Sequence, residues 1–493
     1  MWLAVILFFI FLATYVIQQV KKPLNFPPGP YWLPFVGNLP QLKKLSKSLG
    51  GQHLALSHLA KEYDTNVLGL KLGNDYVVTV FTYPLIRDVL ISEEFEGRPD
   101  NFFLRLRCMG KKRGITCTEG EEWNTLRNFV NRHLRSLGFG KKPMEKMIQA
   151  EICEILAILK KDGSDIQVDK FLAPCVLSVI WTLITGEKIS RENNQLDELL
   201  DLFNLRSKAF DMTGGTLTQY PWLRHFLPDW SGFNLIKSVN ASLKNLFMKY
   251  IQEHKDGWFD GRSEDLIYRY ITEMKTNTET SKYFTDDHLV MVCVDLFIGG
   301  AQTTSRTLGF AFLMMIMFPE VQKKVQEQID KHFDKDSPIQ YSDRYKLPYV
   351  EAVLLETIRY RYVVPIGGPR RVTKDTTLNG YYLPKNTTVL ISFYSINNDP
   401  EYWQNPESFN PERFLDEKGS LLPDEKLIPF ALGRRRCVGE VLAKNCIFLL
   451  FVEILRRYNV SLAPGSKPPT GKPLPGITLS PESYRVKFTE RLL

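Results

Sequence analysis

Apolar positions along the chain follow two periods, one helical and one extended. Apolar residues recur three and four positions apart in several long segments, which is the spacing of one face of a helix. These segments are residues 121–134, 151–159, 195–210, 288–318 and 349–361, and the apolar run 438–457 joins them. The pattern therefore predicts that most of the chain is helical.

Short apolar runs predict a few strands. Residues 67–72 and 77–81 flank Gly73-Asn74-Asp75, so we expect two strands joined by a turn. Asn379-Gly380 predicts a second hairpin, because this pair suits a tight primed turn. Residues 46–493 contain no repeat and no further linker, so we expect one large domain that is mainly α with a small β subdomain.

The first 22 residues read as a membrane segment. Residues 1–20 are almost entirely apolar, and Lys21 and Lys22 follow. A helix of about 20 residues is long enough to cross a bilayer. No basic stretch precedes the run and no small-residue cleavage motif follows, which favours an uncleaved anchor over a signal peptide. We expect a transmembrane signal anchor at 1–22 with the following chain in the cytoplasm, because the lysines lie on its carboxyl side.

Residues 23–45 are rich in proline. Prolines stand at positions 23, 27, 28, 30, 34 and 40. So dense a set disfavours helix and predicts a stiff, extended, proline-rich linker. A proline-rich ligand for a signalling domain is the alternative, but the position directly behind an anchor favours a spacer.

The cysteine count and the net charge indicate the redox state of the thiols and the kind of partner. The seven cysteines are an odd number without paired spacing, so with a cytoplasmic domain they are expected to be reduced thiols. The net charge of +8 is modest for 493 residues and does not indicate a nucleic-acid partner. A local basic patch matters more than this total.

One loop near the carboxyl end carries the strongest chemical signal. Cys437 lies in Phe430-Ala-Leu-Gly-Arg-Arg-Arg-Cys-Val-Gly-Glu440. Gly433 and Gly439 allow positive φ and close approach of the backbone. The helix expected directly after the loop would lower the pKa of the thiol through its dipole and free N–H groups. For Cys437 alone, an inert buried cysteine is the alternative.

The complete pattern F-x-x-G-x-R-x-C-x-G resembles the haem-binding loop of the cytochrome P450 family. The resemblance extends over essentially the whole chain and implies the cytochrome P450 fold, with 46–493 as a haem-thiolate catalytic domain. It implies haem b with Cys437 as the axial metal ligand, Phe430 beside the sulfur, and Arg435 at a haem propionate. Thiolate ligation favours O–O cleavage.

The resemblance implies further propionate partners. Trp123 and Arg127 form W-x-x-x-R, one helical turn apart. A buried indole beside a solvent-facing arginine is the alternative for this pair. Arg98, in E-G-R-P, and Arg370, after Pro369, resemble two more partners. Two buried carboxylates require several fixed cations.

The segment Phe297-Ile-Gly-Gly-Ala-Gln-Thr-Thr-Ser305 interrupts a long apolar helix with glycines. Because glycine costs about 1 kcal/mol against alanine in a helix, small-residue helix packing is one explanation. The segment also resembles the oxygen-binding groove of the family, with Thr303 as the threonine that assists oxygen activation. The acid that commonly precedes it is Gln302 here, which can orient water but cannot carry a proton. Asp295, or a water chain held by Thr303 and Gln302, could replace that acid.

Two other motifs resemble family features. Glu356, Arg359 and Arg413 match E-x-x-R and P-E-R-F, for which we expect a structural role. Basic residues also cluster in the two segments that should frame Cys437. These are Arg132, Arg135, Lys141, Lys142, Arg434, Arg436 and Lys444. A solvated basic face is the ordinary explanation of any one of them, but together they suit an acidic NADPH-cytochrome P450 reductase, with cytochrome b5 as a second candidate partner.

Position in the family indicates the substrate pocket. Its expected walls are 102–108, 203–212, 297–301, 363–368 and the region near Ile477. Gly300, Gly367 and Gly368 would leave space near the iron. These mainly apolar segments predict a lipophilic small-molecule substrate. Residues 219–226 are amphipathic and aromatic, so they suit a lid in contact with membrane lipid, with a packed loop as the alternative.

The segments around Pro27-Pro28-Gly29-Pro30 and Phe95-Glu-Gly-Arg-Pro-Asp100 resemble insect microsomal members of the family related to methyl farnesoate epoxidase. This resemblance implies an endoplasmic reticulum membrane protein that uses O2, and NADPH through the reductase, to epoxidise methyl farnesoate to juvenile hormone. Three alternatives stay open: a broad monooxygenase of lipophilic xenobiotics, a haem-thiolate hydroperoxide isomerase, and a non-enzymatic haem sensor. Gln302 suggests the isomerase, whereas Thr303 and the basic face around Cys437 oppose it.

Overall fold

The structure is a computed structural model that describes residues 2–189, 195–208, 215–276, 279–335, 337–422 and 424–492. Helices account for most of it, which confirms the predicted fold class. The helices are α1 (Trp2–Val20), α2 (Leu39–Leu49), α3 (Gln52–Glu62), α4 (Tyr83–Ile91), α5 (Phe102–Arg107), α6 (Gly114–Cys117), α7 (Gly120–Ser136), α8 (Lys142–Asp162), α9 (Val168–Thr185), α10 (Gln195–Lys208), α11 (Gly215–Gln219), α12 (Leu223–Phe226), α13 (Phe233–Asp256), α14 (Leu266–Thr276), α15 (Asp286–Met317), α16 (Pro319–His332), α17 (Pro348–Tyr360), α18 (Phe393–Asn397) and α19 (Glu440–Arg457).

Strands form three small sheets. The strands are β1 (Val67–Leu72), β2 (Asp75–Val80), β3 (Ile166–Gln167), β4 (Arg370–Arg371), β5 (Thr376–Leu378), β6 (Tyr381–Leu383), β7 (Thr388–Ile391), β8 (Tyr458–Leu462) and β9 (Arg485–Glu490). The sheet orders are β1-β2-β7-β4, β3-β9-β8 and β5-β6. Both predicted hairpins are present: β1 pairs with antiparallel β2, and Asn379 and Gly380 join β5 to β6 with φ of 49° and 79°.

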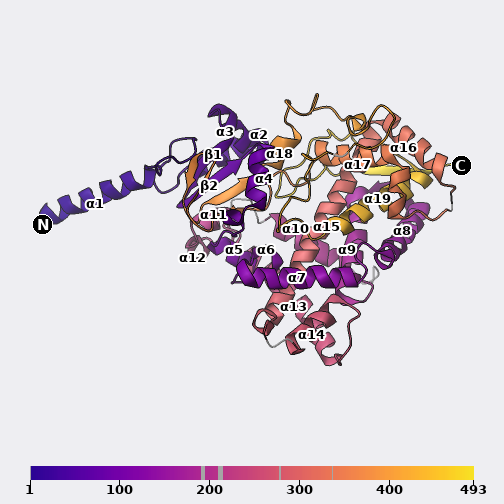
Figure 1. Cartoon of the computed structure of the whole chain (residues 1–493), viewed down its shortest axis with the longest axis horizontal. Helices are drawn as coiled ribbons and strands as arrows, with labels where there is room; N and C mark the ends of the chain where they lie inside the picture. Colours follow the sequence, from indigo (N-terminus) through magenta and orange to yellow (C-terminus); the bar gives the residue numbers. More distant parts are fainter. Residues whose placement is uncertain are drawn as a thin grey trace.

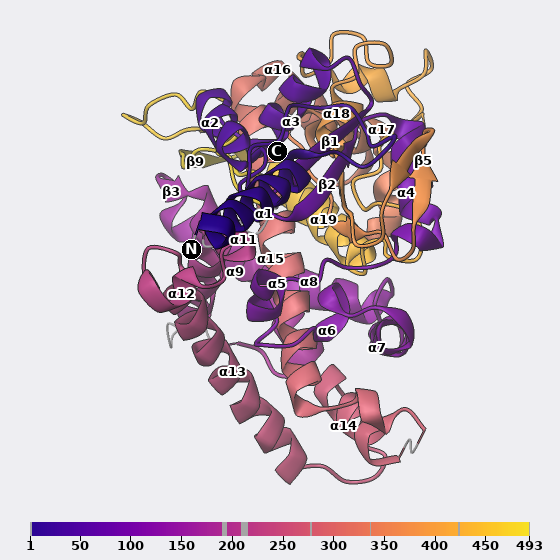
Figure 2. The same cartoon turned by 90° about the vertical axis from the view of Figure 1, so that its left-hand side faces the viewer.

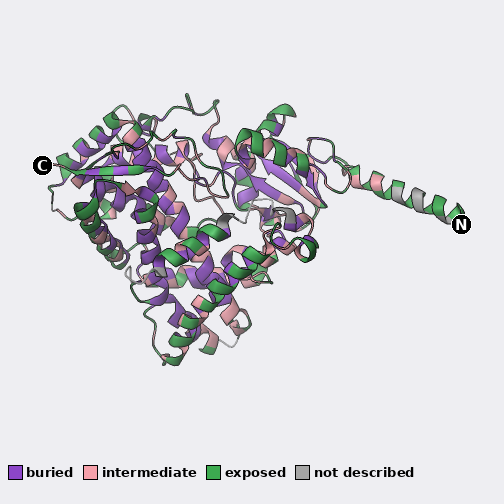
Figure 3. Ribbon diagram, turned by 180° about the vertical axis from the view of Figure 1, so that it is seen from behind, coloured by how far each residue is buried: buried purple, intermediate pink, exposed green. Residues whose placement is uncertain are grey.

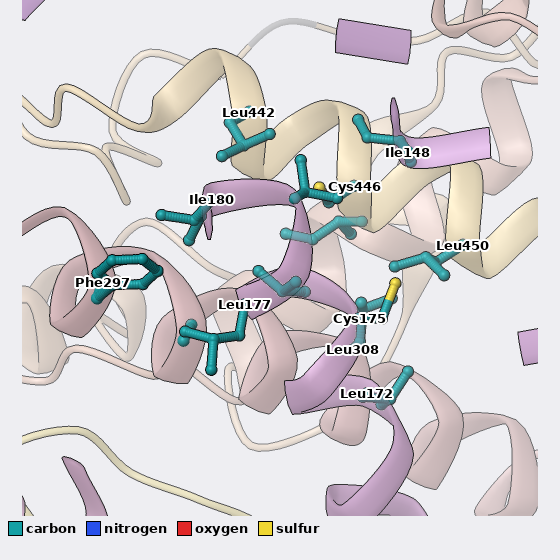
Figure 4. Close-up of a cluster of buried hydrophobic side chains, with 14 of the residues drawn as sticks. Ile148, Leu172, Cys175, Leu177, Ile180, Phe297, Leu308, Leu442, Cys446 and Leu450 are labelled. Atoms are coloured by element: carbon teal, nitrogen blue, oxygen red, sulfur yellow. The ribbon is translucent and has the colours of Figure 1, made fainter. Parts of the chain in front are cut away.

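The core surrounds α15. This helix is buried over most of its length and packs against α9 and α19. Figure 4 shows side chains of α8, α9, α15 and α19 converging, among them Phe297, Cys175 and Cys446. All seven cysteines are free thiols, and these two fill space as small apolar side chains. In Figure 3, the buried residues line this interior while the outer helix faces are exposed.

Helix α9 is apolar on all sides because the core encloses it. Helix α9 has the length and apolar composition of a membrane span, but 78% of it is buried inside the protein. A helix apolar all round is expected at the centre of a large core. Figure 2 shows α9 beside α15, with α13 running from near α12 into the lower part of the view, where α14 also lies.

Helix α1 projects from the body of the protein (Figure 1). Its apolar side chains are exposed, for example Trp2 at 77% and Phe11 at 70%. The Lys71 ammonium group donates to the backbone and side-chain oxygens of Gln19 at 2.7 and 2.8 Å, which ties the end of α1 to β1.

The proline-rich segment after α1 packs against the folded body. Phe26 and Trp32 are buried against Tyr76 of β2, with ring centroids 5.5 and 5.6 Å from the tyrosine. The Gly69 N–H donates to the Pro28 carbonyl at 2.7 Å. Helix α2 begins at Leu39, inside the predicted linker 23–45. Pro40 does not prevent this, because it lies in the first turn of the helix, where proline is tolerated. The proline-rich stretch is therefore largely part of the folded domain.

Candidate functional site

Backbone hydrogen bonds and a glycine with positive φ fix the conformation of the cysteine loop. The Cys437 N–H donates to the Phe430 carbonyl at 2.9 Å, and the Arg436 N–H donates to the Gly433 carbonyl at 3.2 Å. Gly433 has φ of +73°, and a Cβ there would lie 2.2 Å from the Leu90 carbonyl oxygen. The chain therefore requires glycine at position 433 for both its conformation and its packing.

Gly439 serves a different purpose from the one expected. Its φ is −89°, so Gly439 does not adopt the positive φ that glycine allows. Gly439 is the N-cap of α19, and a Cβ there would stand 3.8 Å from the Cys437 sulfur. Glycine thus leaves one side of the sulfur clear for a flat ligand.

Cys437 is a free thiol that solvent can reach, although many protein atoms surround it. Burial raises its pKa, while backbone N–H groups of Gly439 and Glu440 and the Arg127 guanidinium act in the opposite direction. The expected helix-end donors are thus present, but burial outweighs them and the prediction of a lowered pKa is wrong for the free thiol. A metal cation bound to the sulfur would keep it deprotonated.

Three arginines gather beside this loop, and two of them, Arg370 and Arg435, are buried. Arg435 is 9% exposed, and its Nη2 donates to the Thr118 carbonyl at 2.9 Å. Within the described part of the chain, its Nε and Nη1 have no hydrogen-bond partner, and neither has Nη1 of Arg370. Arg98 donates from Nη1 to the Pro369 carbonyl at 2.7 Å, which places it next to Arg370. Unused donors on buried cations are uncommon in folded proteins and indicate a bound anion.

The electrostatics of this arginine cluster support the same conclusion. Burial and the neighbouring Arg98 lower the pKa of Arg435 to about 8 and that of Arg370 to about 9. Burial also lowers the pKa of Arg98 to about 10. A group with two carboxylates, such as haem with its propionates, would relieve this repulsion and accept the unused N–H donors. The residues present therefore fit haem.

Trp123 and Arg127 occupy less direct positions than predicted. The Trp123 indole N–H donates to the Ile115 carbonyl at 3.1 Å, so this donor is already used. Its ring face instead lies 4.2 Å from the Arg435 guanidinium and supports it. Arg127 donates from Nη2 to the Arg436 carbonyl, while its buried Nε has no hydrogen-bond partner among the residues that the structure describes.

Glu119 is a site residue that the motifs did not reveal. It pairs with Arg371 at 2.7 Å and Lys112 at 2.9 Å, and it accepts the Arg98 backbone N–H at 2.9 Å. This carboxylate fixes the backbone of Arg98 and the strand that holds Arg370. Its position directly before α7, in Glu119-Gly-Glu-Glu-Trp123, was the available signal, since acids favour helix amino ends.

On helix α15, the residues of the 297–305 motif face different neighbours. The Thr303 hydroxyl donates to the Gly299 carbonyl at 2.6 Å. Space adjoins Gly299, where an added Cβ would meet nothing within 4 Å. At Gly300 a Cβ would lie 2.3 Å from Ile180 of α9, so the expectation that Gly300 leaves space near the iron is wrong. The open groove therefore lies along Gly299 and Thr303.

Neither candidate replacement for the missing acid lies beside the Thr303 hydroxyl. The Gln302 amide is buried and donates to Asn204 of α10 at 3.2 Å, away from this groove. Asp295 accepts the backbone N–H groups of Ile115 and Thr116, both at 2.9 Å, and so anchors α6. Among the described residues, no carboxylate forms a hydrogen bond with Thr303.

The structural triad is confirmed. Arg359 binds Glu356 through two hydrogen bonds of 2.7 and 2.8 Å, and Arg413 lies 3.1 Å from the same carboxylate. Glu356 and Arg359 are fully buried. Arg359 also donates to the carbonyls of Asn397, Pro406 and Ser408, so the triad fixes the segment that leads into the cysteine loop.

The two basic segments meet on one face. A Cβ on Gly140 would lie 3.0 Å from Val441, which places the turn between α7 and α8 against the start of α19. Arg434 is partly neutralised, because it pairs with Glu96 at 2.9 Å, and Lys444 pairs with Glu440 at 2.7 Å. The other members of the predicted set are exposed: Arg132, Arg135, Lys141, Lys142 and Arg436.

Parts of the expected pocket wall are packed into the core. Phe297 is fully buried and stacks with Phe203 and Phe247 at 6.1 and 5.5 Å. A Cβ on Gly367 would lie 3.0 Å from Phe393, so this glycine does not leave the expected space. Residues 209–212 of the predicted wall lie outside the described residues.

Comparison with known proteins agrees with this geometry. The family model described as Cytochrome P450 matches residues 27–488. Probable cytochrome P450 305a1 of Drosophila melanogaster is 42% identical, with 98% of this chain and 97% of the relative covered. Farnesoate epoxidase of Bombyx mori is 35% identical, with 99% of each covered. Cytochrome P450 2J5 of Mus musculus is 34% identical, with 97% of this chain and 93% of the relative covered. Motif, fold and full-length similarity agree that the chain belongs to the cytochrome P450 family.

Proposed function

We propose that this protein is a haem-thiolate monooxygenase that inserts one oxygen atom into a lipophilic substrate. The observation that carries the proposal is the group of buried arginines with unused donors beside Cys437. In this proposal Cys437 binds the iron, and Arg98, Arg370 and Arg435 hold the two propionates. Arg127 adds charge beside the sulfur, and Phe430, Gly433 and Gly439 shape the loop.

The roles of the distal residues follow from their contacts. Bound haem supplies dioxygen activation, and the thiolate favours O–O cleavage. Thr303 holds a proton at Oγ1, in a hydrogen bond to the Gly299 carbonyl. Rotation of this hydroxyl into the open space beside Gly299 would present the proton to the groove. Gln302 positions α10 through Asn204, so proton supply to Thr303 relies on water rather than on a neighbouring acid.

For the reaction, we propose epoxidation of methyl farnesoate to juvenile hormone. The support is the insect relative named Farnesoate epoxidase, which is similar over its full length. The predicted wall is apolar around α5, where Phe103 packs with Leu217 and Ile236. An elongated sesquiterpenoid is consistent with such a wall.

Electron supply and location complete the proposal. The exposed basic residues around Cys437 suit an acidic NADPH-cytochrome P450 reductase, which would transfer electrons from NADPH, and cytochrome b5 could bind the same face. The exposed apolar helix α1 would anchor the protein in the endoplasmic reticulum membrane, with the catalytic domain in the cytoplasm. Exposed Trp222 and Phe226 near α12 would contact membrane lipid.

Reconstitution with the reductase, NADPH and methyl farnesoate tests the proposal. We expect one epoxide enantiomer, identified by chiral chromatography and mass, and no product without NADPH. Farnesoic acid, offered in parallel, would separate acid from ester preference. Correctly ligated haem with no epoxide would exclude methyl farnesoate as substrate, and product from a hydroperoxide without NADPH would indicate an isomerase.

A second candidate is a monooxygenase with broad specificity for lipophilic compounds. It is favoured by similarity to cytochrome P450 305a1 and cytochrome P450 2J5, whose names specify no insect hormone. Comparable turnover of several unrelated lipophiles would support this candidate over the hormone-forming one.

A further inference from the structure

A buried histidine lies where three helices end or begin, outside the site described above. His254 belongs to the last turn of α13 and is 5% exposed. Thr185 is the last residue of α9, and Asp265, which is 1% exposed, directly precedes α14. The His254 Nε2 atom lies 3.2 Å from both the Thr185 carbonyl oxygen and an Asp265 carboxylate oxygen. One imidazole ring therefore connects the ends of α9, α13 and α14.

Both nitrogens of this ring face oxygen atoms that accept hydrogen bonds. Nδ1 lies 2.7 Å from the Tyr250 carbonyl oxygen, while Nε2 faces the Thr185 carbonyl and the Asp265 carboxylate. A neutral imidazole carries one N–H, so in either tautomer its other nitrogen would direct a lone pair at an oxygen. An imidazolium donates from both nitrogens and satisfies both sides. The geometry therefore favours a positively charged ring beside an ionised carboxylate.

The Asp265 carboxylate is held in place from two sides. Its Oδ1 accepts the Tyr268 backbone N–H at 2.8 Å, as an acid at the N-cap of a helix does. Its Oδ2 lies beside Gly186, where an added Cβ would stand 2.9 Å away. Gly186 has φ of +74° and ends α9, so glycine at this position both terminates the helix and leaves room for the carboxylate.

Helix ends add to the attraction for a positive ring. The Thr185 carbonyl lies at the carboxyl end of α9, and His254 itself lies in the last turn of α13. Carboxyl ends of helices carry partial negative charge, which favours a cation. Burial alone would lower the pKa of His254, but Asp265 and the carbonyls of Tyr250 and Thr185 outweigh burial, so the pKa is raised above its ordinary value of 6.5.

The other ionisable groups around the pair are uncharged or are paired elsewhere. Tyr268 of α14 packs on the His254 ring with centroids 4.4 Å apart, and burial raises the pKa of Tyr268. Burial also raises the pKa of Cys293 of α15, which lies near Asp265. Glu187, after α9, acts on Tyr268. The charged neighbours from α13 and from the segment before α14 form the ion pairs Lys255–Asp286, Lys249–Glu253 and Arg262–Glu264.

We propose that His254 and Asp265 form a pH-sensitive lock that holds the ends of α9, α13 and α14 together while the ring is protonated. Loss of the ring proton would remove the ion pair and turn a lone pair toward an oxygen. The lock would therefore loosen as pH rises. This inference depends neither on the identity of the oxidised substrate nor on the haem.

The lock lies at the far end of a helix that also reaches the expected substrate pocket. Helix α13 runs from near α12 to the part of Figure 2 where α14 lies. Toward its start, Asn240 donates to the Leu106 carbonyl of α5 at 2.8 Å, and Ile236 packs with Phe103 of α5. Since α5 belongs to the predicted pocket wall, release of the lock would free one end of a helix whose other end supports this wall.

Thermal unfolding of the full-length haem-loaded protein between pH 6 and pH 9 tests the lock. A histidine with a raised pKa in the folded state stabilises the protein below its unfolded pKa of about 6.5, and this contribution is lost as pH rises through the folded pKa. His254→Gln removes the charge and the titration. We expect this variant to lower the thermal midpoint by about 3 °C at pH 6, and the difference from native protein to shrink toward zero at pH 9.

Asp265→Asn provides an independent variant. Asparagine is also a good N-cap residue, so α14 should keep its first turn, and the amide can donate to a neutral His254. Without the carboxylate the ring has no ionic partner. We therefore expect Asp265→Asn to lose the same pH-dependent part of the stability as His254→Gln.

His332→Gln is the matched control. His332 also lies in the last turn of a helix, α16, and its Nδ1 faces the carbonyl of Gln328 four residues earlier at 3.0 Å, but its side chain is exposed. Exposed substitutions of this kind have small effects, so the control should shift the midpoint by less than about 1 °C, and equally at pH 6 and pH 9.

Hydrogen exchange of backbone amides shows where the protein loosens. Residues 185–187 and 266–269 should exchange faster in both variants than in native protein at pH 6, and at the same rate in all three proteins at pH 9. A midpoint difference between native protein and His254→Gln that stays constant from pH 6 to pH 9 would overturn the proposal. Retention of the native pH dependence in Asp265→Asn would overturn it as well, because the carboxylate would then not be the partner of the charged ring.

Discussion

Removal of the Glu356 carboxylate should destabilise the protein more than removal of an exposed acid. In Glu356→Ala, the two guanidiniums of Arg359 and Arg413 stay buried without their shared carboxylate, which lies 2.7 and 3.1 Å from them. The Asn410 N–H also loses its acceptor, now at 2.9 Å. Breaking a buried pair by removing one partner costs about 3–5 kcal/mol.

This free energy converts to a measurable melting shift. At about 2.1 cal/mol/K per residue, unfolding of a 493-residue chain carries an entropy of about 1 kcal/mol/K. A loss of about 3–5 kcal/mol should lower the thermal midpoint by about 3–5 °C. The assay is thermal unfolding followed by circular dichroism at one fixed scan rate, because large proteins often unfold irreversibly.

Glu327→Ala is the matched control. Glu327 lies 3.8 Å from Lys323 in an exposed pair, with side-chain exposures of 63% and 79%. Exposed pairs contribute at most about 1 kcal/mol, so this variant should shift the midpoint by less than about 1 °C. Equal midpoints for Glu356→Ala and Glu327→Ala would refute the assignment of a structural role to the triad.

Four further predictions concern the site and its surroundings. Arg435→Leu should reduce the haem content of the purified protein, because it removes a buried cation with two unused donor groups. Haem content is measured by absorbance relative to total protein, and an undiminished value would contradict the propionate assignment. Gly433→Ala should also reduce haem content, since a Cβ would lie 2.2 Å from the Leu90 carbonyl oxygen and φ is +73°; a fully haem-loaded variant would show that the loop tolerates the side chain. Thr303→Ala should leave haem binding unchanged and lower the ratio of product formed to NADPH consumed, and an unchanged ratio would exclude a role for its hydroxyl. Glu351→Gln should raise the thermal midpoint by about 2 °C above pH 7, because burial penalises the ionised carboxylate of Glu351. This penalty is absent below pH 4.5, grows as pH rises, and is complete above the folded pKa of about 7. Equal midpoints of the native protein and the variant at pH 8 would show that burial does not raise this pKa.

The cysteine loop, the triad and the hairpins could be predicted because each depends on local chemistry. Gly433 in the loop and Asn379-Gly380 in the hairpin adopt positive φ, which their residue types favour. The E-x-x-R spacing places Glu356 and Arg359 one turn apart on α17, where they meet.

Side-chain direction around the distal helix could not be predicted in the same way. Adjacent positions on a helix point about 100° apart, so a motif that groups Gly299, Gly300, Gln302 and Thr303 does not say which of them share a face. The partners decide this: Ile180 packs where Gly300 lies, and Asn204 binds Gln302. Both partners lie about a hundred residues away in the chain.

Two other features depended on tertiary packing. Helix α9 was not predicted, because it is apolar all round and contains Pro174. The proline-rich segment was predicted as a stiff, extended linker, and the sequence did not show that Phe26 and Trp32 bury their rings against β2. Proline density limits helix formation but does not show where the neighbouring aromatic residues pack.

The central claim is that Cys437 provides the thiolate ligand of a bound haem. The most direct measurement is the absorption spectrum of the carbon monoxide complex of the reduced full-length protein, compared with that of Cys437→His. We predict the band of thiolate-ligated haem in the native protein, and in Cys437→His a shift to the band of histidine-ligated haem or loss of haem. An identical thiolate-type band in both proteins would contradict the account, because another cysteine would then have to bind the iron.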